Sequence, residues 1–155
     1  MRDVTVGKNI HSNLVAAYIA GFLDGDGAIC ANIERHSEKK FKFRVRISLD
    51  FYQHKKNVSE LKFIRNALGE GYLGKSNRNT QKLSLKNQST LKTILPELHR
   101  FTQIKKKQIE IALEILNISI ETKEDLIKVA KMADKLSRLN IRASARRKNS
   151  SKIIV

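Results

Sequence analysis

The stretch AAYIAGFLDGDG, residues 16–27, combines an apolar helical run with two carboxylates at its end. Its small residues recur at every fourth position, and in a helix Ala17, Gly21 and Gly25 would lie on one ridge. Because none of these side chains is larger than a methyl group, another helix could approach this backbone unusually closely. We therefore predict a helix whose ridge of small residues contacts a second helix.

Two carboxylates, Asp24 and Asp26, follow this ridge and are separated only by glycine. A core helix with a glycine stop and an acidic turn is a simpler interpretation, and spacing alone does not reject it. A calcium loop of the EF-hand type is rejected, because that loop needs glycine at its sixth position and glutamate at its twelfth. Counted from Asp24, those positions hold Ile29 and Arg35.

Strong positive charge is the main feature of the composition. The 155 residues include 31 Lys and Arg against 15 Asp and Glu, which gives a net charge of +16, and 41% of the residues are hydrophobic. A folded core with such an excess of positive charge most often binds nucleic acid. The alternative is an ordinary soluble protein with a highly charged surface. The length favours a single domain over residues 1–155, with a basic tail at residues 141–155.

The sequence also indicates where the protein works. Cys30 is its one cysteine, so no internal disulfide and no oxidising compartment are implied. No apolar run approaches the ~20 residues that a membrane span needs. The start, MRDVTVGKNIHSN, is too polar for a secretory signal. We therefore expect an intracellular protein that has no membrane partner and works where it is made.

Changes in hydrophobic periodicity divide the chain into helices and strands. Thr122 and Asp125 have the spacing of a capping box at the start of a last helix, and Pro96 is expected to start or kink a helix. This pattern predicts an α+β fold, in which a four-stranded antiparallel sheet has helices on one face and leaves the other face open. The predicted elements are a helix at 12–25, strands at 29–36 and 43–53, a helix at 59–68, strands at 71–77 and 81–87, and helices at 89–101, 105–117 and 123–140.

The open face of this sheet would carry basic, acidic and neutral polar side chains together. Base edges in the major groove offer both donors and acceptors, so a surface that reads sequence needs both kinds of group. For any one of these residues, a solvated sheet face is the simpler interpretation. The candidates for contacts with nucleic acid are Asn32, Glu34, Arg44, Arg46, Ser48, Asp50, Lys82, Ser84 and Lys86.

The decapeptide YIAGFLDGDG, residues 18–27, resembles the signature motif of the LAGLIDADG homing endonucleases. The resemblance extends over residues 13–140, and one motif in a short chain is similar to the single-motif subgroup of homodimers. It implies the αββαββα fold, with saddle-shaped sheets in the major groove of double-stranded DNA. It also implies a long, nearly palindromic target that is cut on both strands across the minor groove, leaving 3′ extensions. The motif helices of the two copies would then pack together through Ala17, Ala20, Gly21 and Asp24.

The same resemblance assigns roles to individual polar residues. Asp26 corresponds to the acid that binds a divalent metal, Mg2+ or Mn2+, with the Gly25 carbonyl beside it. Gln53 corresponds to a polar residue that orders water in the active site, and Lys105 to a basic residue near the scissile phosphate. A cation between close carboxylates would explain why so basic a chain has acids here. Asp24 is expected to cap or brace the end of the helix rather than to bind the metal.

The sequence departs from the family at one position of the active site. A further basic residue is expected a few positions after the glutamine, where this chain has Asn57. Lys55 or Lys56 would then have to supply that charge.

The main alternative is a protein of this type that binds nucleic acid without cutting it, such as an RNA maturase or a DNA-binding regulator. Asp26 beside Gln53 and Lys105 favours cleavage, because a binding module has no need of a metal-binding acid among phosphates. A general RNA-binding protein of ribosomal type would explain the charge and leave the ridge of small residues unexplained. The four histidines are scattered and predict no zinc site.

Overall fold

The computed structural model describes residues 12–140, so the basic tail at 141–155 lies outside the described residues. The order of helices and strands expected from the sequence is confirmed. The elements are α1 (Asn13–Asp26), β1 (Gly27–Arg35), β2 (Phe43–His54), a short 3-10 turn (Lys55–Asn57), α2 (Val58–Leu68), β3 (Tyr72–Lys75), β4 (Thr80–Leu85), α3 (Gln88–His99), α4 (Lys106–Asn117) and α5 (Lys123–Asn140). None of the helices within residues 12–140 is long and apolar enough to cross a bilayer.

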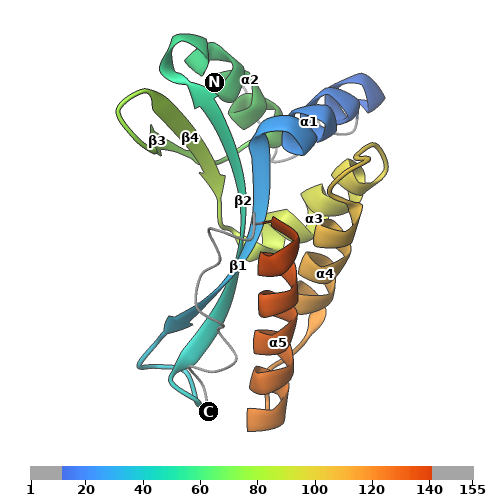
Figure 1. Cartoon of the computed structure of the whole chain (residues 1–155). Coiled ribbons are helices and arrows are strands. Elements are labelled where there is room, and N and C mark those ends of the chain that lie inside the picture. The colour runs from blue at the N-terminus through green and yellow to red at the C-terminus, as the bar shows by residue number, and fades with distance from the viewer. Residues whose placement is uncertain (1–11, 141–155) are drawn as a thin grey trace.

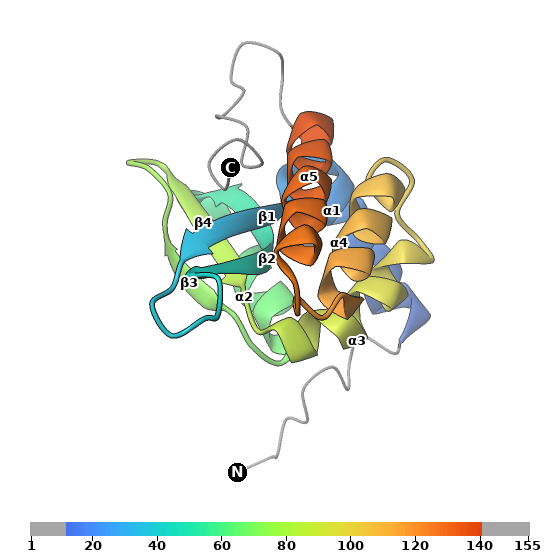
Figure 2. The same cartoon turned by 90° about the horizontal axis from the view of Figure 1, so that it is seen from below.

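Four antiparallel strands form one sheet in the order β1-β2-β4-β3. The central strand, β2, pairs along most of its length with β1, but β4 pairs only with its second half, from Leu49 onward. Helices α3, α4 and α5 lie together on one side of β1 and β2 (Figures 1 and 2). The hairpin of β1 and β2 extends beyond the rest of the sheet, as Figure 1 shows.

The core lies on one face of the sheet, as the alternation in the sequence predicts. Ile47, Leu49 and Phe51 of β2 are fully buried, and they join Leu83 and Leu85 of β4 in one apolar cluster with the helices. Residues at the even positions of β2 therefore point to the opposite face, because successive side chains of a strand alternate. The predicted α+β fold with one open sheet face is confirmed.

Helix α1 separates its small residues onto two faces. Ala16, Ile19, Ala20 and Leu23 form the buried face, at the spacing of a helix that packs on a core. The prediction that Ala20 contacts a second copy is therefore wrong, since its side chain has no exposed surface. Ala17, Gly21 and Gly25 lie on the exposed face.

A glycine at the end of α1 lets the helix turn directly into β1. A Cβ on Gly27 would lie 2.7 Å from a methyl of Leu23 and 2.9 Å from its Cα, so a larger residue does not fit. The helix and the strand therefore join without a connecting loop, which places Asp26 at the junction of helix and sheet. Gly69 ends α2 with φ of 84°, a left-handed conformation that suits glycine.

Two further local predictions concern helix ends. Thr122 and Asp125 form the expected reciprocal cap of α5: the hydroxyl of Thr122 accepts from the Asp125 N–H at 3.1 Å, and the Asp125 carboxylate accepts from the Thr122 N–H at 2.8 Å. Pro96 lies inside α3, so the prediction that it could start a helix is wrong.

Candidate active site and nucleic-acid interface

The junction of α1 and β1 brings Asp26 next to Gln53. Gly27 pairs with Phe51 in the sheet, so the end of the helix lies beside the end of β2. The Gln53 Nε2 atom donates to Asp26 Oδ2 at 3.4 Å, and Gln53 Oε1 accepts from the His54 N–H at 2.9 Å. The second contact fixes which end of the amide faces the carboxylate.

The carboxylate of Asp24 holds the loop that precedes α4. It accepts from the hydroxyl of Thr102 and from the backbone N–H groups of Gln103 at 2.7 Å, Ile104 at 3.3 Å and Lys105 at 3.1 Å. Asp24 was expected to face a second copy of the chain, and this expectation is corrected, because its side chain is directed into a loop of its own chain. The result is that Lys105, the residue before α4, is fixed at the same end of α1 as Asp26.

The pKa of Asp24 reflects these contacts. Burial alone would raise it, but the bonds from Thr102 and from three backbone N–H groups together lower the pKa below its usual value. A carboxyl whose pKa is lower in the folded state stabilises the fold at pH values above its unfolded pKa. This stabilisation is lost as the pH falls through the folded pKa.

Asp24→Ala is expected to lower the free energy of unfolding by about 2–3 kcal/mol at neutral pH, because several donors lose a charged acceptor. The difference from the native protein should shrink in acid, where the native carboxyl is protonated. Urea unfolding at several pH values measures both effects. Asp24→Asn keeps an acceptor oxygen without the charge. Its free energy of unfolding should therefore lie between those of Asp24→Ala and the native protein. Equal stability of Asp24→Ala and the native protein at neutral pH would contradict this account.

Asp24 and Asp26 differ in how their charge is compensated. Both lie in the last turn of α1, where the helix dipole already places partial negative charge. Four hydrogen-bond donors stabilise the charge of Asp24, whereas the exposed Asp26 accepts from the neutral amide of Gln53 at 3.4 Å. An exposed carboxylate at the negative end of a helix favours a cation. The carbonyl of Gly25 belongs to the same final turn, whose carbonyls have no partner further along the helix.

One copy of the chain does not form a complete metal centre. Within residues 12–140, no group of three or more His, Cys, Asp or Glu side chains comes together. Oxygen donors from Asp26 and Gly25 suit a hard divalent cation, which would take its other ligands from water, phosphate or a second copy. The residues present therefore fit part of a divalent-cation site.

The other predicted basic residues lie nearby. Lys55, Lys56 and Asn57 form the exposed 3-10 turn directly after β2, and the Lys56 N–H donates to His54 Nδ1 at 3.2 Å. Both lysines are therefore placed near Gln53, and Asn57 follows them in the same turn.

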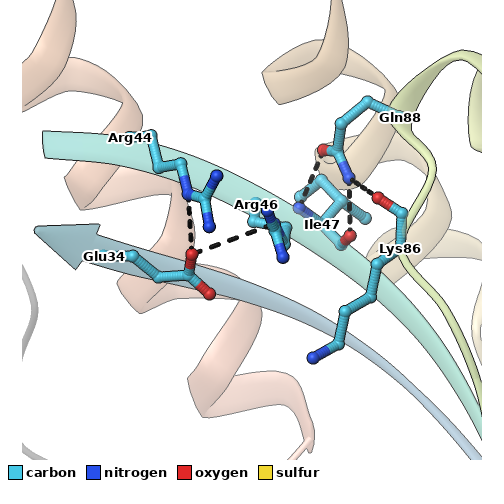
Figure 3. A network of polar contacts seen from close by, with 6 residues as sticks. All are labelled: Glu34, Arg44, Arg46, Ile47, Lys86 and Gln88. Atoms are coloured by element: carbon cyan, nitrogen blue, oxygen red, sulfur yellow. Dashed lines mark hydrogen bonds and ion pairs between the residues drawn. The ribbon is translucent and has the colours of Figure 1, made fainter. Parts of the chain in front are cut away.

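The open face of the sheet carries linked charges along β1 and β2. Glu34 Oε2 lies 2.8 Å from Arg44 Nε and 3.8 Å from Arg46 Nε, and Asn32 pairs with Arg46 across the two strands. Figure 3 shows one oxygen of the Glu34 carboxylate in contact with both Arg44 and Arg46. All four side chains are partly exposed, so both donors and acceptors are available on this face.

Three of the predicted contact residues are buried instead. Ser48, Asp50 and Ser84 are 2%, 4% and 8% exposed. Asp50 accepts from Ser84 Oγ at 2.5 Å and from Ser48 Oγ at 3.3 Å, and it lies 3.7 Å from Lys82 Nζ. The prediction that these three touch DNA directly is corrected: they form a polar layer beneath the surface that holds Lys82.

Two tyrosines on this face, Tyr52 and Tyr72, were not among the residues predicted to contact DNA. Tyr72 is 77% exposed and borders a hollow of about 800 Å³ on the hairpin of β3 and β4, where Gly74 leaves room for its ring. The alternation of Tyr72 with Leu73 in the sequence could have placed Tyr72 on this face. However, β3 has only four residues, which is too short for a clear alternating pattern. Burial, and then the charge of Asp50, raise the pKa of Tyr52 to about 12.

Comparison with known proteins agrees with this geometry. The chain is 32% identical over 133 residues to DNA endonuclease I-CvuI of Chlorella vulgaris, a match that covers 84% of this chain and 83% of that protein. It is 28% identical over 140 residues to DNA endonuclease I-CreI of Chlamydomonas reinhardtii, covering 88% and 84% of the two chains. The crystal structure of I-CvuI with the I-CreI target in the presence of magnesium superposes with a TM-score of 0.83 and 28% identity, over 94% of this chain and 92% of the other.

The family model for LAGLIDADG endonucleases matches residues 19–115, from the middle of α1 to the end of α4. This range contains Asp26, Gln53 and Lys105 together with the whole sheet. The chain therefore belongs to the LAGLIDADG endonuclease family.

Proposed function

We propose that this endonuclease binds a long, nearly palindromic DNA duplex as a homodimer and cuts both strands across the minor groove. The observation that carries the proposal is the exposed ridge of Ala17, Gly21 and Gly25, which ends at Asp26 and its partner Gln53. The minor groove of B-DNA is only ~6 Å wide, so the two active sites that cut across it must be close together. Small residues at a helix contact allow that approach.

Asp26 and the Gly25 carbonyl would hold a divalent cation, which we propose to be Mg2+ or Mn2+. Structures of I-CvuI with DNA were solved in the presence of magnesium and of calcium, which supports a divalent cation in this fold. When bound, such a cation polarises the phosphate and lowers the pKa of bound water.

Gln53 and Lys105 would complete the catalytic residues. The Gln53 amide is held by the His54 N–H and directed at Asp26, so it can orient a water molecule beside the scissile phosphate. Lys105 is held through its N–H by Asp24, and its ammonium group would neutralise negative charge that develops on the phosphate. Lys55 or Lys56 would supply the additional positive charge that is expected at the position of Asn57.

The open sheet face would lie in the major groove. Partly exposed cations there can bind phosphates or guanine, while Glu34 and Asn32 can accept from cytosine or pair with adenine. Since the enzyme needs its target, we propose that it works with the DNA of the compartment that encodes it. The residues proposed to contact DNA are Asn32, Glu34, Arg44, Arg46, Lys82 and Lys86, with Tyr72 beside them.

Cleavage of the insertion site tests this proposal. The DNA that flanks the gene, joined without the coding element, should contain the target, because a homing enzyme acts where its element inserts. Incubation of this DNA with the protein and Mg2+ or Mn2+ should give one double-strand break with 3′ extensions, and chelator should prevent it. Tight binding without a break under every metal condition would favour a non-cleaving maturase or regulator.

Lys105→Met is expected to slow single-turnover cleavage by roughly 10- to 100-fold, because a charge near the phosphate is lost while other lysines remain close. Quenched time courses with excess enzyme measure this rate. Lys106→Met, which removes an exposed neighbour, is the matched control and should have little effect. An unchanged rate for Lys105→Met would show that Lys105 is only a solvated surface residue.

A further inference from the structure

The side chain of Gln88 takes the place of a missing strand residue at the end of β4. The pairing of β2 with β4 stops at Leu49 and Leu85, because the chain turns away into α3. Continued pairing would place Asn87 opposite Ile47. Instead, Asn87 caps α3 by accepting from the N–H groups of Ser89 at 3.1 Å and Thr90 at 3.3 Å.

One side-chain amide satisfies both backbone groups of Ile47. Gln88 Oε1 accepts from the Ile47 N–H at 2.9 Å, and Gln88 Nε2 donates to the Ile47 carbonyl at 2.9 Å. The same Nε2 donates to the Lys86 carbonyl at 2.6 Å (Figure 3). The amide therefore ties β2 to the segment that follows β4, beyond the last pair of the ladder.

These contacts fix two cations of the open face that come from different strands. The side chain of Ile47 is fully buried in the core, so its neighbour Arg46 must point to the opposite face. Arg46 is also held loosely by Glu34, with Nε 3.8 Å from the carboxylate. Lys86 is exposed and is held through its carbonyl. Without Gln88, the edge of β2 that faces β4 would lose its partner at Ile47, and this part of β2 would be held by its pairing with β1.

We propose that Gln88 is a positioning residue for sequence recognition: its amide sets the direction of Arg46 and Lys86 against the base edges of the target. The inference rests on the proposed function, because it needs DNA on the open face. Direct readout requires a guanidinium to be aimed at guanine O6 and N7, so a small shift of the strand weakens discrimination more than it weakens phosphate contacts.

The residue type agrees with this role. A side-chain amide carries one acceptor oxygen and a nitrogen with two hydrogens, which are the groups that the Ile47 N–H and the carbonyls of Ile47 and Lys86 need, and Asn is one carbon shorter. In Gln88→Glu, a second carboxylate oxygen would face the carbonyls of Ile47 and Lys86, which are both acceptors. Gln88→Met keeps the length and loses all three hydrogen bonds.

Binding across a panel of singly substituted targets tests the proposal. We expect Arg46→Ala to reduce discrimination at one symmetric pair of positions by roughly 5- to 100-fold. Gln88→Met should reduce discrimination at those same positions by at least about threefold. It should cause no further loss there when combined with Arg46→Ala, and Gln88→Glu should resemble Gln88→Met.

Asn87→Ala is the matched control, since it removes a helix cap in the same loop, at a cost of about 1 kcal/mol, without a contact to β2. Thermal unfolding confirms that each variant is folded at the assay temperature. A uniform loss across the panel for Gln88→Met, an additive loss in the double variant, or the same pattern in Asn87→Ala would overturn the positioning role. A native protein that binds all sequences alike would instead overturn the proposed function.

Discussion

Asp26→Asn is expected to reduce DNA cleavage by several orders of magnitude while the target is still bound. The substitution preserves the shape of the side chain, and the Gln53 Nε2 that lies 3.4 Å from Asp26 Oδ2 can still donate to an amide oxygen. It removes the negative charge that would hold a divalent cation at the end of α1. Affinity for DNA should change little or rise, because an acid that repels phosphate is lost.

Single-turnover cleavage and equilibrium binding, both on the target in the presence of Mg2+, separate the two effects. Asp125→Asn is the matched control, because this exposed carboxylate caps α5 and has no place in the proposed site. Its cleavage rate should equal that of the native protein. Normal cutting by Asp26→Asn would remove Asp26 from the metal site and with it the proposed mechanism.

The elements that depend on local periodicity were predictable from the sequence. The alternation of Ile47, Leu49 and Phe51 with polar residues predicted β2 and its buried face, and Gly69 predicted the end of α2. The convergence of Asp26 and Gln53 could be expected only through the resemblance to a family. Nothing local in the chain indicates that the ends of α1 and β2 meet.

Burial on the open face could not be predicted from alternation. The pattern places Ser48, Asp50 and Ser84 on that face, but their depth depends on how the neighbouring strand and Lys82 cover them. The three therefore bond to one another and support the surface. A polar residue on the binding face of a sheet need not touch the ligand.

Contacts between segments that lie far apart along the chain could not be predicted from the sequence either. Different roles were expected for the two acids of α1, and the structure agrees, because Asp24 braces the end of the helix and Asp26 is exposed. The partners of Asp24 are the hydroxyl of Thr102 and the N–H groups of residues 103–105, which lie 78 to 81 residues further along the chain. Gln88 could not be recognised either, because its role depends on where β4 ends.

The exposed ridge of α1 packs against nothing within residues 12–140. A Cβ placed on Gly21 or Gly25 would meet no atom within 4 Å, so the described part of the monomer does not require glycine at either position. Glycine in a helix costs about 1 kcal/mol relative to alanine. Leu14 and Tyr18, which are 84% and 44% exposed, lie on the same helix. These exposed residues are small or apolar, and the glycines among them lower the stability of the helix. This combination indicates contact with a second molecule.

Gly21→Leu is therefore expected to abolish the homodimer and, with it, cleavage of both strands. The leucine side chain would extend into open space in the monomer, and helix α1 should become slightly more stable, because leucine is the better helix former. In a dimer, the same side chain would separate two backbones that need to touch, and the two active sites would no longer reach across one minor groove. Sedimentation velocity at micromolar concentration and the cleavage assay measure the two losses. Lys131→Leu, which adds a leucine to an exposed position of α5, should remain dimeric and active. A Gly21→Leu protein that stays dimeric would contradict the proposed interface, and a native monomer that cuts DNA would contradict the need for a dimer.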